Sequence, residues 1–195
     1  MIRFLKSSWW NALSVQIGWW VSVLAAADGR PWIGPPVVIL LVTLHLWTCP
    51  SSPTRRRDAV TVLTLGAIGT AIDSAQVCAG LLRFEAAPAP CLCPIWIVAL
   101  WLHFGITPRS SLAFLRRRPW LGALFGGIAG PAAFYAGERL GAVAFHPELW
   151  PSLLSLSVIW AGVIPALVAF AWRQEDGATD RAATGGRRGA SSSRP

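Results

Sequence analysis

Six long apolar runs constrain this chain more than any other feature of its sequence. Each extends over about 18 residues or more, and a helix of about 20 apolar residues crosses the hydrocarbon layer of a bilayer. A chain of 195 residues with 54% hydrophobic and 13% charged residues is too apolar for an ordinary soluble domain. The sequence therefore predicts an all-α, polytopic membrane helix bundle with transmembrane helices at about residues 9–28, 32–49, 59–82, 95–115, 120–141 and 149–172.

The distribution of arginine predicts which side of the membrane each loop faces. Runs of three arginines occupy positions 55–57 and 116–118, whereas the loops of the opposite side contain only Arg30, Arg83 and Arg139. Short loops rich in Lys and Arg stay in the cytoplasm, so we expect both termini to be cytoplasmic and the protein to lie in a bacterial inner (plasma) membrane.

The same distribution bears on the partners of the chain. A net charge of +8 can indicate nucleic-acid binding, but here the arginines lie in short clusters between apolar runs rather than on one basic face. We therefore expect the lipid bilayer as the partner, with room for a membrane-protein partner and no nucleic acid. The oligomeric state does not follow from the sequence.

The two ends of the chain differ from the apolar middle. A short basic start precedes the first run, which makes a cleaved signal peptide the alternative to a retained helix. The length of that run and its polar Asn11 and Gln16 favour the retained helix. After Trp172 no large apolar residue remains, so residues 1–172 are predicted to form the transmembrane domain and residues 173–195 a disordered basic cytoplasmic tail.

Glycines at intervals of four residues mark the fifth run. Gly122, Gly126 and Gly130 fall on one side of a helix, with Gly127 beside them and Pro131 immediately after. Small residues let two helix backbones approach closely in a membrane, where close packing drives association. We expect this ridge to pack against a neighbouring helix of the same chain, and Pro131 to mark a break that opens towards the outer face.

The fourth run, at 95–115, contains Pro108, and its first part is too short to cross the bilayer. We therefore expect the helix to continue through a kink at Pro108, with Arg109 reaching towards the lipid headgroups. An internal similarity joins Arg30-Pro31-Trp32-Ile33-Gly34 to Arg118-Pro119-Trp120-Leu121-Gly122. It is explained either by an inverted repeat of three helices or by the local preference of Pro and Trp for helix entrances.

Ionisable groups inside apolar runs are functional-site candidates, because burying them is costly. Asp73 and His103 fall at similar depths, so they could meet between two adjacent helices, while His45 falls in a shallower layer with Asn11, Gln16 and Thr64. These three ionisable residues are the weak catalytic candidates, as proton-transfer groups. The alternative is that each is satisfied by a neighbouring helix, and no third metal ligand accompanies them, so no metal or cofactor is expected. The predicted polar intramembrane residues are Asn11, Gln16, His45, Asp73, His103 and Tyr135.

Three of the four cysteines lie near one outer loop. A disulfide from Cys78 to Cys91 or Cys93 is compatible with an oxidising compartment, but unpaired packing cysteines are the favoured interpretation. The sequence does not decide between the two.

Several short motifs occur in order across all six runs and resemble one bacterial integral-membrane family, catalogued as domain of unknown function 2878. The resemblance covers about residues 9–172 and rests on Asn11 to Trp20, Pro31 to Gly34, His45, Asp73, Pro94 to Trp101, Phe104, Gly126 to Pro131, Tyr135 to Gly137 and Leu140 to Ala142. It implies a small polytopic inner-membrane protein and, through the lipid-methylation and redox genes that neighbour its members, a role in membrane-lipid metabolism.

Three functions are compatible with these features. The first is an accessory or scaffold protein in membrane-lipid or envelope stress metabolism, since no catalytic motif is present and an enzyme is not favoured. The second is a small proton-coupled transporter with an inverted repeat of three plus three helices. The third is an intramembrane enzyme that modifies a lipid through His45, Asp73 and His103.

Overall fold

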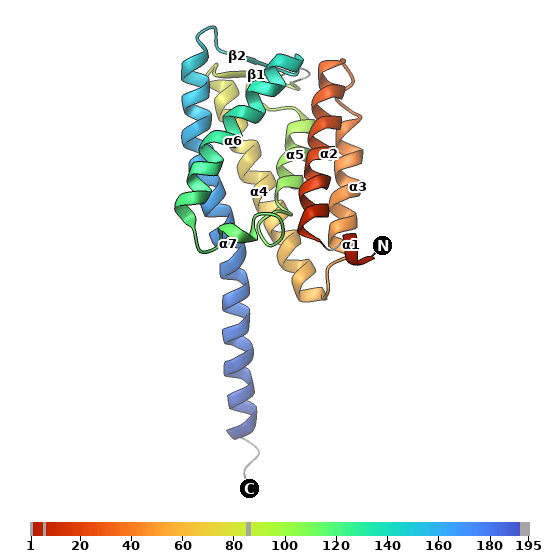
Figure 1. Cartoon of the computed structure of the whole chain (residues 1–195), viewed down its shortest axis with the longest axis vertical. Helices are drawn as coiled ribbons and strands as arrows, with labels where there is room; N and C mark the ends of the chain where they lie inside the picture. Colours follow the sequence, from red (N-terminus) through yellow and green to blue (C-terminus); the bar gives the residue numbers. More distant parts are fainter. Residues whose placement is uncertain (1, 6, 85–86, 192–195) are drawn as a thin grey trace.

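The computed structural model describes residues 2–5, 7–84 and 87–191, and the side-chain surroundings of residues 4–5, 7–84 and 87–174. The described chain is mainly helical, as the sequence predicts. Figure 1 shows the long helices packed side by side as a bundle. The elements are α1 (Ile2–Leu5), α2 (Ser8–Ala27), α3 (Gly34–Trp47), α4 (Ser52–Cys78), β1 (Leu82–Phe84), α5 (Ile95–Phe104), a 3₁₀ turn (Ala113–Leu115), α6 (Pro119–Leu140), β2 (Val143–Phe145) and α7 (Leu149–Ser191).

A two-stranded antiparallel sheet, absent from the predicted all-α fold, closes one end of the bundle. Leu82 pairs with Phe145 and Phe84 with Val143. Leu82, Phe84 and Val143 are buried and cover the core, and the ring of Phe84 meets Trp96 edge to face at 5.8 Å. Strands of three residues are too short to produce a recognisable alternation in the sequence, and the pairing joins segments far apart in the chain. We call this the sheet end of the bundle (Figure 1).

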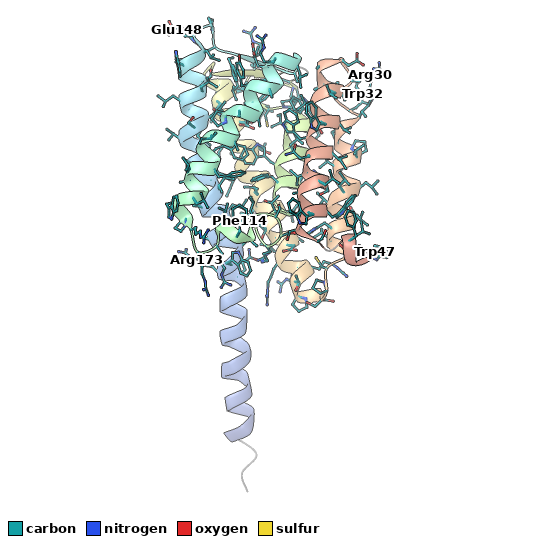
Figure 2. All side chains as sticks on the ribbon, viewed as in Figure 1. Arg30, Trp32, Trp47, Phe114, Glu148 and Arg173 are labelled. Atoms are coloured by element: carbon teal, nitrogen blue, oxygen red, sulfur yellow. A yellow bond between two sulfur atoms is a disulfide. The ribbon has the colours of Figure 1, made fainter. Side chains whose placement is uncertain are left out.

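The arginine clusters lie at the opposite end of the bundle. The runs at 55–57 and 116–118 stand at the beginnings of α4 and α6, which lie at this end, and Arg173 is labelled there in Figure 2. Arg30, Arg83 and Arg139 lie instead at or beside the sheet end. We call the arginine-rich end the basic end.

Helix lengths bear on the predicted membrane spans. Among the described residues, α4 and the part of α7 from Leu149 to Gln174 are long and apolar enough to cross a membrane, whereas α3 and α5 are shorter apolar helices. Length and composition therefore support two crossings on their own. Helix length and composition do not test the predicted total of six crossings, which stays a prediction.

The fourth predicted helix, 95–115, is wrong beyond Phe104, where α5 ends after ten residues. Residues 105–118 continue as turns and one 3₁₀ turn rather than as a kinked helix. Gly105 lies against the backbone of Val62, and Thr107 precedes Pro108, which disfavours helical geometry at Thr107. Both causes act at the end of α5, so the chain leaves the helical path there.

The division of the chain into a transmembrane domain and a disordered tail, 173–195, stays a prediction. α7 continues as one helix to Ser191 and projects beyond the basic end without the rest of the bundle around it (Figure 1). Residues 192–195, the end of the predicted tail, lie outside the described residues.

One cysteine pair is joined by a disulfide, Cys78 with Cys91, so the favoured interpretation of unpaired cysteines is wrong for these two. The bridge ties the end of α4 to the segment that leads into α5. Cys93 is a buried free thiol, and Cys49 is a half-buried free thiol between α3 and α4. A single residue separates the alternatives Cys91 and Cys93, and only the fold decides which of them reaches Cys78.

The internal similarity between the two Pro-Trp motifs is not matched by equal positions in the fold. Pro119 and Trp120 are the first two residues of α6, whereas Pro31 and Trp32 lie in the turn before α3. The helices that follow have 22 and 14 residues. The inverted repeat therefore stays a prediction without support from these motifs.

The glycine ridge of α6 faces α7. Gly122, Gly126 and Gly130 are buried, and α6 continues through Pro131 to Leu140 without ending there. A side chain at Gly126 would meet the backbone carbonyl of Trp160, and one at Gly130 would overlap the Trp160 ring. Gly127, one position along, has only ordinary contacts with Ala161 and Ser157 at 3.5 Å.

Alanine substitutions at the neighbouring glycines should therefore separate backbone contact from helix propensity. Both Gly126→Ala and Gly127→Ala gain about 1 kcal/mol of helix propensity, but only Gly126→Ala pushes a methyl group into a backbone atom. We expect Gly126→Ala to be less stable than Gly127→Ala by about 1–3 kcal/mol. Detergent-mediated unfolding followed by tryptophan fluorescence measures the difference. Equal stability of the two variants would contradict the close approach of α6 and α7.

Candidate functional site

A buried tryptophan on the short helix α5 fixes the centre of the bundle. The ring of Trp101 rests on Gly69 of α4, where any side chain would overlap the indole. One helical turn further along α4, Asp73 accepts a hydrogen bond of 2.7 Å from Trp101 Nε1. The other side of the indole stacks on Trp160 of α7, with ring centroids 4.8 Å apart and 12° between the planes. Trp101 thus joins α4, α5 and α7.

The carboxylate of Asp73 is fully buried, with 0% of the residue exposed. Its second oxygen accepts a hydrogen bond of 3.0 Å from Gln76 Nε2, and Ser155 of α7 donates in turn to Gln76 Oε1 at 3.2 Å. Both groups that donate to Asp73 are neutral. The side chain is therefore held in one orientation by hydrogen bonds, without a basic partner among the described ion pairs.

His103, near the end of α5, is a buried polar side chain that forms no hydrogen bond with the described residues. It is 1% exposed, and its ring packs against Gly18 of α2, where a side chain would collide with Nδ1. Neither Nδ1 nor Nε2 has a hydrogen-bond partner among the described residues, and the same holds for Trp160 Nε1 nearby. A neutral imidazole offers one donor and one acceptor, and both are available here.

Asp73 and His103 line the same cavity of about 380 Å³, which α2, α4, α5, α6 and α7 enclose together. Its walls are mostly apolar and aromatic, with Trp19, Trp96 and Phe134 among them. The sequence leaves open whether Asp73 and His103 meet. The structure brings them to one cavity, but it shows no hydrogen bond between them among the described contacts.

The cavity reaches the outer surface between α2 and α6. Gln16 on α2 and Phe125 on α6 both line it, and both are exposed, Phe125 by 42%. Figure 1 shows that α6 runs obliquely across the bundle, close to α2 at the sheet end and further from it towards the basic end.

A second polar cluster lies at the basic end and includes the third histidine. Asp58 of α4 accepts from Arg109 Nη1 at 2.6 Å, and its other oxygen lies 3.2 Å from His45 Nε2 of α3. Arg109 also donates to the backbone carbonyl of Ala171 in α7. The expectation that Arg109 reaches the lipid headgroups is therefore wrong, because its two terminal nitrogens bind a buried carboxylate and a helix carbonyl inside the protein.

Sequence reasoning missed Asp58 and Cys49 as members of this cluster. Asp58 directly follows the arginines at 55–57, where a solvated charge is the simplest interpretation, and no local spacing relates it to Arg109. Cys49 donates to the same carboxylate at 3.5 Å. In the sequence, the spacing His45-x-x-x-Cys49 is the feature that could have indicated this cluster.

The remaining predicted polar residues lie apart from one another. Asn11 is buried and joins α2 to the irregular segment after α5, since it donates to the Ile106 carbonyl and accepts from Ser111 Oγ at 2.6 Å. No hydrogen bond joins Asn11 to His45 among the described residues, and their common shallow layer stays a prediction. Gln16 stands at the rim of the cavity, and Tyr135 is 43% exposed on the outside of α6.

The fold and the site together define a class: a helical bundle with a largely apolar cavity that holds one fixed carboxylate and one unpaired imidazole. The sequence pattern of the family described as "protein of unknown function (DUF2878)" matches residues 8–166. The chain belongs to this family, as the motifs quoted above predict. No curated protein and no solved structure matches the chain in the same kind of comparison.

The pair formed by Asp58 and Arg109 provides a direct test of the basic-end cluster. Their side chains are 9% and 11% exposed, so Arg109→Met leaves an uncompensated buried carboxylate. We expect a loss of about 3–5 kcal/mol in the free energy of unfolding. Adding Asp58→Asn to Arg109→Met should recover part of it, because the buried charge is removed as well. A double variant as unstable as Arg109→Met would show that the charge of Asp58 is not the cause.

Proposed function

We propose that this chain is a multi-pass membrane protein that crosses the bilayer six times, with the basic end in the cytoplasm. The outside of the bundle supports this proposal, because large apolar side chains are exposed along its middle. They include Leu13, Ile17, Ile39, Leu40, Leu63, Ile68, Leu124, Ile128, Leu154 and Val158. A soluble protein rarely exposes an apolar surface of this extent, whereas lipid covers such a surface without loss.

Exposed tryptophans mark two levels of the bundle. Trp9, Trp47 and Trp120 are 85%, 72% and 67% exposed and lie at helix ends near the basic end. Trp32 and Trp150 are 64% and 79% exposed near the sheet end, and Figure 2 shows Trp32 and Trp47 at opposite ends of α3. Two aromatic levels with an apolar band between them are typical of the two membrane interfaces.

The short helix α5 is compatible with this arrangement because it lies inside the bundle. Ten residues give about 15 Å of helix, about half of a hydrocarbon layer. Irregular backbone is tolerated at membrane depth where protein surrounds it. Residues 105–112 meet this condition: Ile106, Thr107 and Pro108 are buried, and Asn11 hydrogen-bonds to the Ile106 carbonyl and to the Ser111 N–H.

Reporter fusions test the orientation. We expect alkaline phosphatase to be active when fused after Pro147, at the sheet end, and inactive when fused after Arg173. A fluorescent protein after Arg173 should be bright, because it folds in the cytoplasm. Phosphatase activity at both positions, or at Arg173 alone, would contradict the proposed topology.

Within the membrane, we propose that the protein binds a lipid-like molecule in its cavity and serves membrane-lipid metabolism as an accessory protein. The unpaired imidazole of His103 in an apolar cavity carries this proposal. Buried polar groups are nearly always hydrogen-bonded, and one that is not is a reason to look for a ligand. A volume of about 380 Å³ falls in the range of ligand pockets, which is about 300–1,000 Å³.

The surroundings of the cavity define the chemistry of the ligand. Its opening between α2 and α6 lies at the level of the exposed apolar side chains, so the proposed source of the ligand is the bilayer. Apolar walls accommodate hydrocarbon. The His103 ring can donate a hydrogen bond to an ester or carbonyl oxygen, and it can donate to or accept from a hydroxyl group. Asp73, already occupied by two donors, helps to hold Trp101 as the back wall rather than to bind the ligand.

A large side chain introduced into the cavity should prevent the ligand from binding. Ala133 of α6 lines the cavity, whereas the adjacent Ala132 is exposed on the outside of the same helix. We expect Ala133→Phe to abolish co-purification of a lipid that the unchanged protein retains in mild detergent, as measured by native mass spectrometry. Ala132→Phe adds the same side chain and should retain it. Identical lipid content in both variants would refute binding in the cavity.

Chemistry on the bound molecule is the second candidate, because Asp73 and His103 line the same cavity. An imidazole with a free donor and acceptor can move a proton, whereas a binding role requires only the hydrogen bond. Lipid profiles of a deletion strain complemented with His103→Asn or with the unchanged chain distinguish the two roles. A lipid that disappears with His103→Asn, while the bound lipid is still found on the purified variant, favours the enzyme.

A further inference from the structure

Three side chains at the basic end converge on one point outside the cavity. They are His45 at the end of α3, Cys49 in the following loop and Asp58 in the second turn of α4. His45 Nε2, Cys49 Sγ and one carboxylate oxygen of Asp58 all lie within 4.8 Å of one another. Asp58 Oδ2 is 3.2 Å from His45 Nε2 and 3.5 Å from Cys49 Sγ. None of the three lines the cavity described above.

Two of these three separations match those between ligands of a tetrahedral metal ion, and the third, between His45 Nε2 and Cys49 Sγ, is within 4.8 Å and would close to about 3.6 Å around the ion. Zinc binds histidine nitrogen at about 2.0–2.1 Å, thiolate sulfur at about 2.3 Å and carboxylate oxygen at about 2.0–2.2 Å. At a tetrahedral angle, the nitrogen–oxygen and sulfur–oxygen pairs are then about 3.3 Å and about 3.6 Å apart. The observed distances of 3.2 Å and 3.5 Å each differ from these values by about 0.1 Å.

The surroundings orient the carboxylate for such a role. Arg109 holds Asp58 Oδ1 at 2.6 Å, which leaves Oδ2 facing His45 and Cys49. Partners of this kind in the outer shell fix the direction of metal ligands and are a regular feature of metal sites. The cluster is also accessible, because His45 and Cys49 are both partly exposed. A metal ion can therefore enter from the basic end.

We propose that His45, Cys49 and Asp58 bind one divalent transition-metal ion of the zinc class, with water in the fourth position. A nitrogen, sulfur and oxygen set excludes magnesium and calcium, which prefer oxygen ligands alone. Cys49 coordinates as a thiolate: the metal–sulfur bond forms as the S–H bond breaks, and the proton leaves to solvent. The thiolate and the carboxylate then neutralise the two charges of the ion, and Arg109 stays paired with Asp58.

The site would join the end of α3 to the beginning of α4 on the side that the proposed topology places in the cytoplasm. It does not depend on the ligand of the cavity, and either proposal can fail alone. Three protein ligands and one open position are typical of sites that exchange water or a small ligand, whereas purely structural zinc sites use four protein ligands.

Cobalt(II) is a suitable probe, because its absorption reports both thiolate ligation and tetrahedral geometry. The experiment uses the tag-free full-length protein in detergent, stripped of metal and then titrated with cobalt(II). We expect one ion per chain, with a sulfur-to-cobalt charge-transfer band and intense visible bands, and displacement by zinc. Cys49→Ser should remove the charge-transfer band and weaken binding at least about tenfold.

Matched variants make the outcome decisive. Cys93→Ser alters a buried thiol that hydrogen-bonds to the Thr70 carbonyl, far from the cluster in the fold, and should leave cobalt binding unchanged. His45→Gln retains a group that can donate to Asp58 and should weaken binding as Cys49→Ser does. If Cys49→Ser does not fold, the cobalt affinity of His45→Gln tests whether the cluster binds metal. The proposal is overturned if no stoichiometric cobalt binds, if the spectrum lacks the thiolate band, or if neither ligand variant changes the affinity.

Discussion

The contact between Trp101 and α4 is the interaction on which the rest of the bundle depends. α5 has ten residues and cannot be fixed by its own length, so its position is set by what its side chains touch. Gly69 leaves space for the indole, and Asp73, one turn along, accepts its N–H at 2.7 Å. Trp160 stacks on the opposite face and rests in turn on Gly130 of α6. Two glycines and two tryptophans therefore connect four helices through the centre of the protein.

The buried polar groups fall into two layers with different physical roles. Near the centre, Asp73 is held by neutral donors, and His103 faces an apolar cavity with both ring nitrogens free. At the basic end, Asp58 is surrounded by His45, Cys49 and Arg109, and its charge is compensated. A low-dielectric interior makes an unpaired polar group costly. The central layer with His103 therefore favours a bound ligand. The layer around Asp58 fixes the positions of α3, α4 and α7 and, in our proposal, binds a cation.

Parts of the fold and of the site could be predicted because they depend on local composition. The family, the helical class and the glycine ridge of α6 follow from motifs and from spacings of four residues. The small sheet, the early end of α5 and the Cys78–Cys91 bridge could not, since each depends on segments that meet only after folding. The candidate site shows the same division. Asp73 and His103 stand out as polar residues in apolar runs, but Asp58 looks like an ordinary solvated charge after three arginines.

The sequence by itself determined that this chain forms apolar helices, that small residues line one face of the fifth run, and that few ionisable groups interrupt the apolar runs. Those properties depend on the residue types and on their spacing along the chain, which can be compared within one or two helical turns. Only the tertiary structure decided that Asp73 holds a tryptophan instead of His103, that Arg109 turns inward to Asp58, and that His45 and Cys49 reach the same carboxylate. Each of these pairings crosses between elements, and the depth and rotation of a helix are set by packing against its neighbours rather than by its own residues.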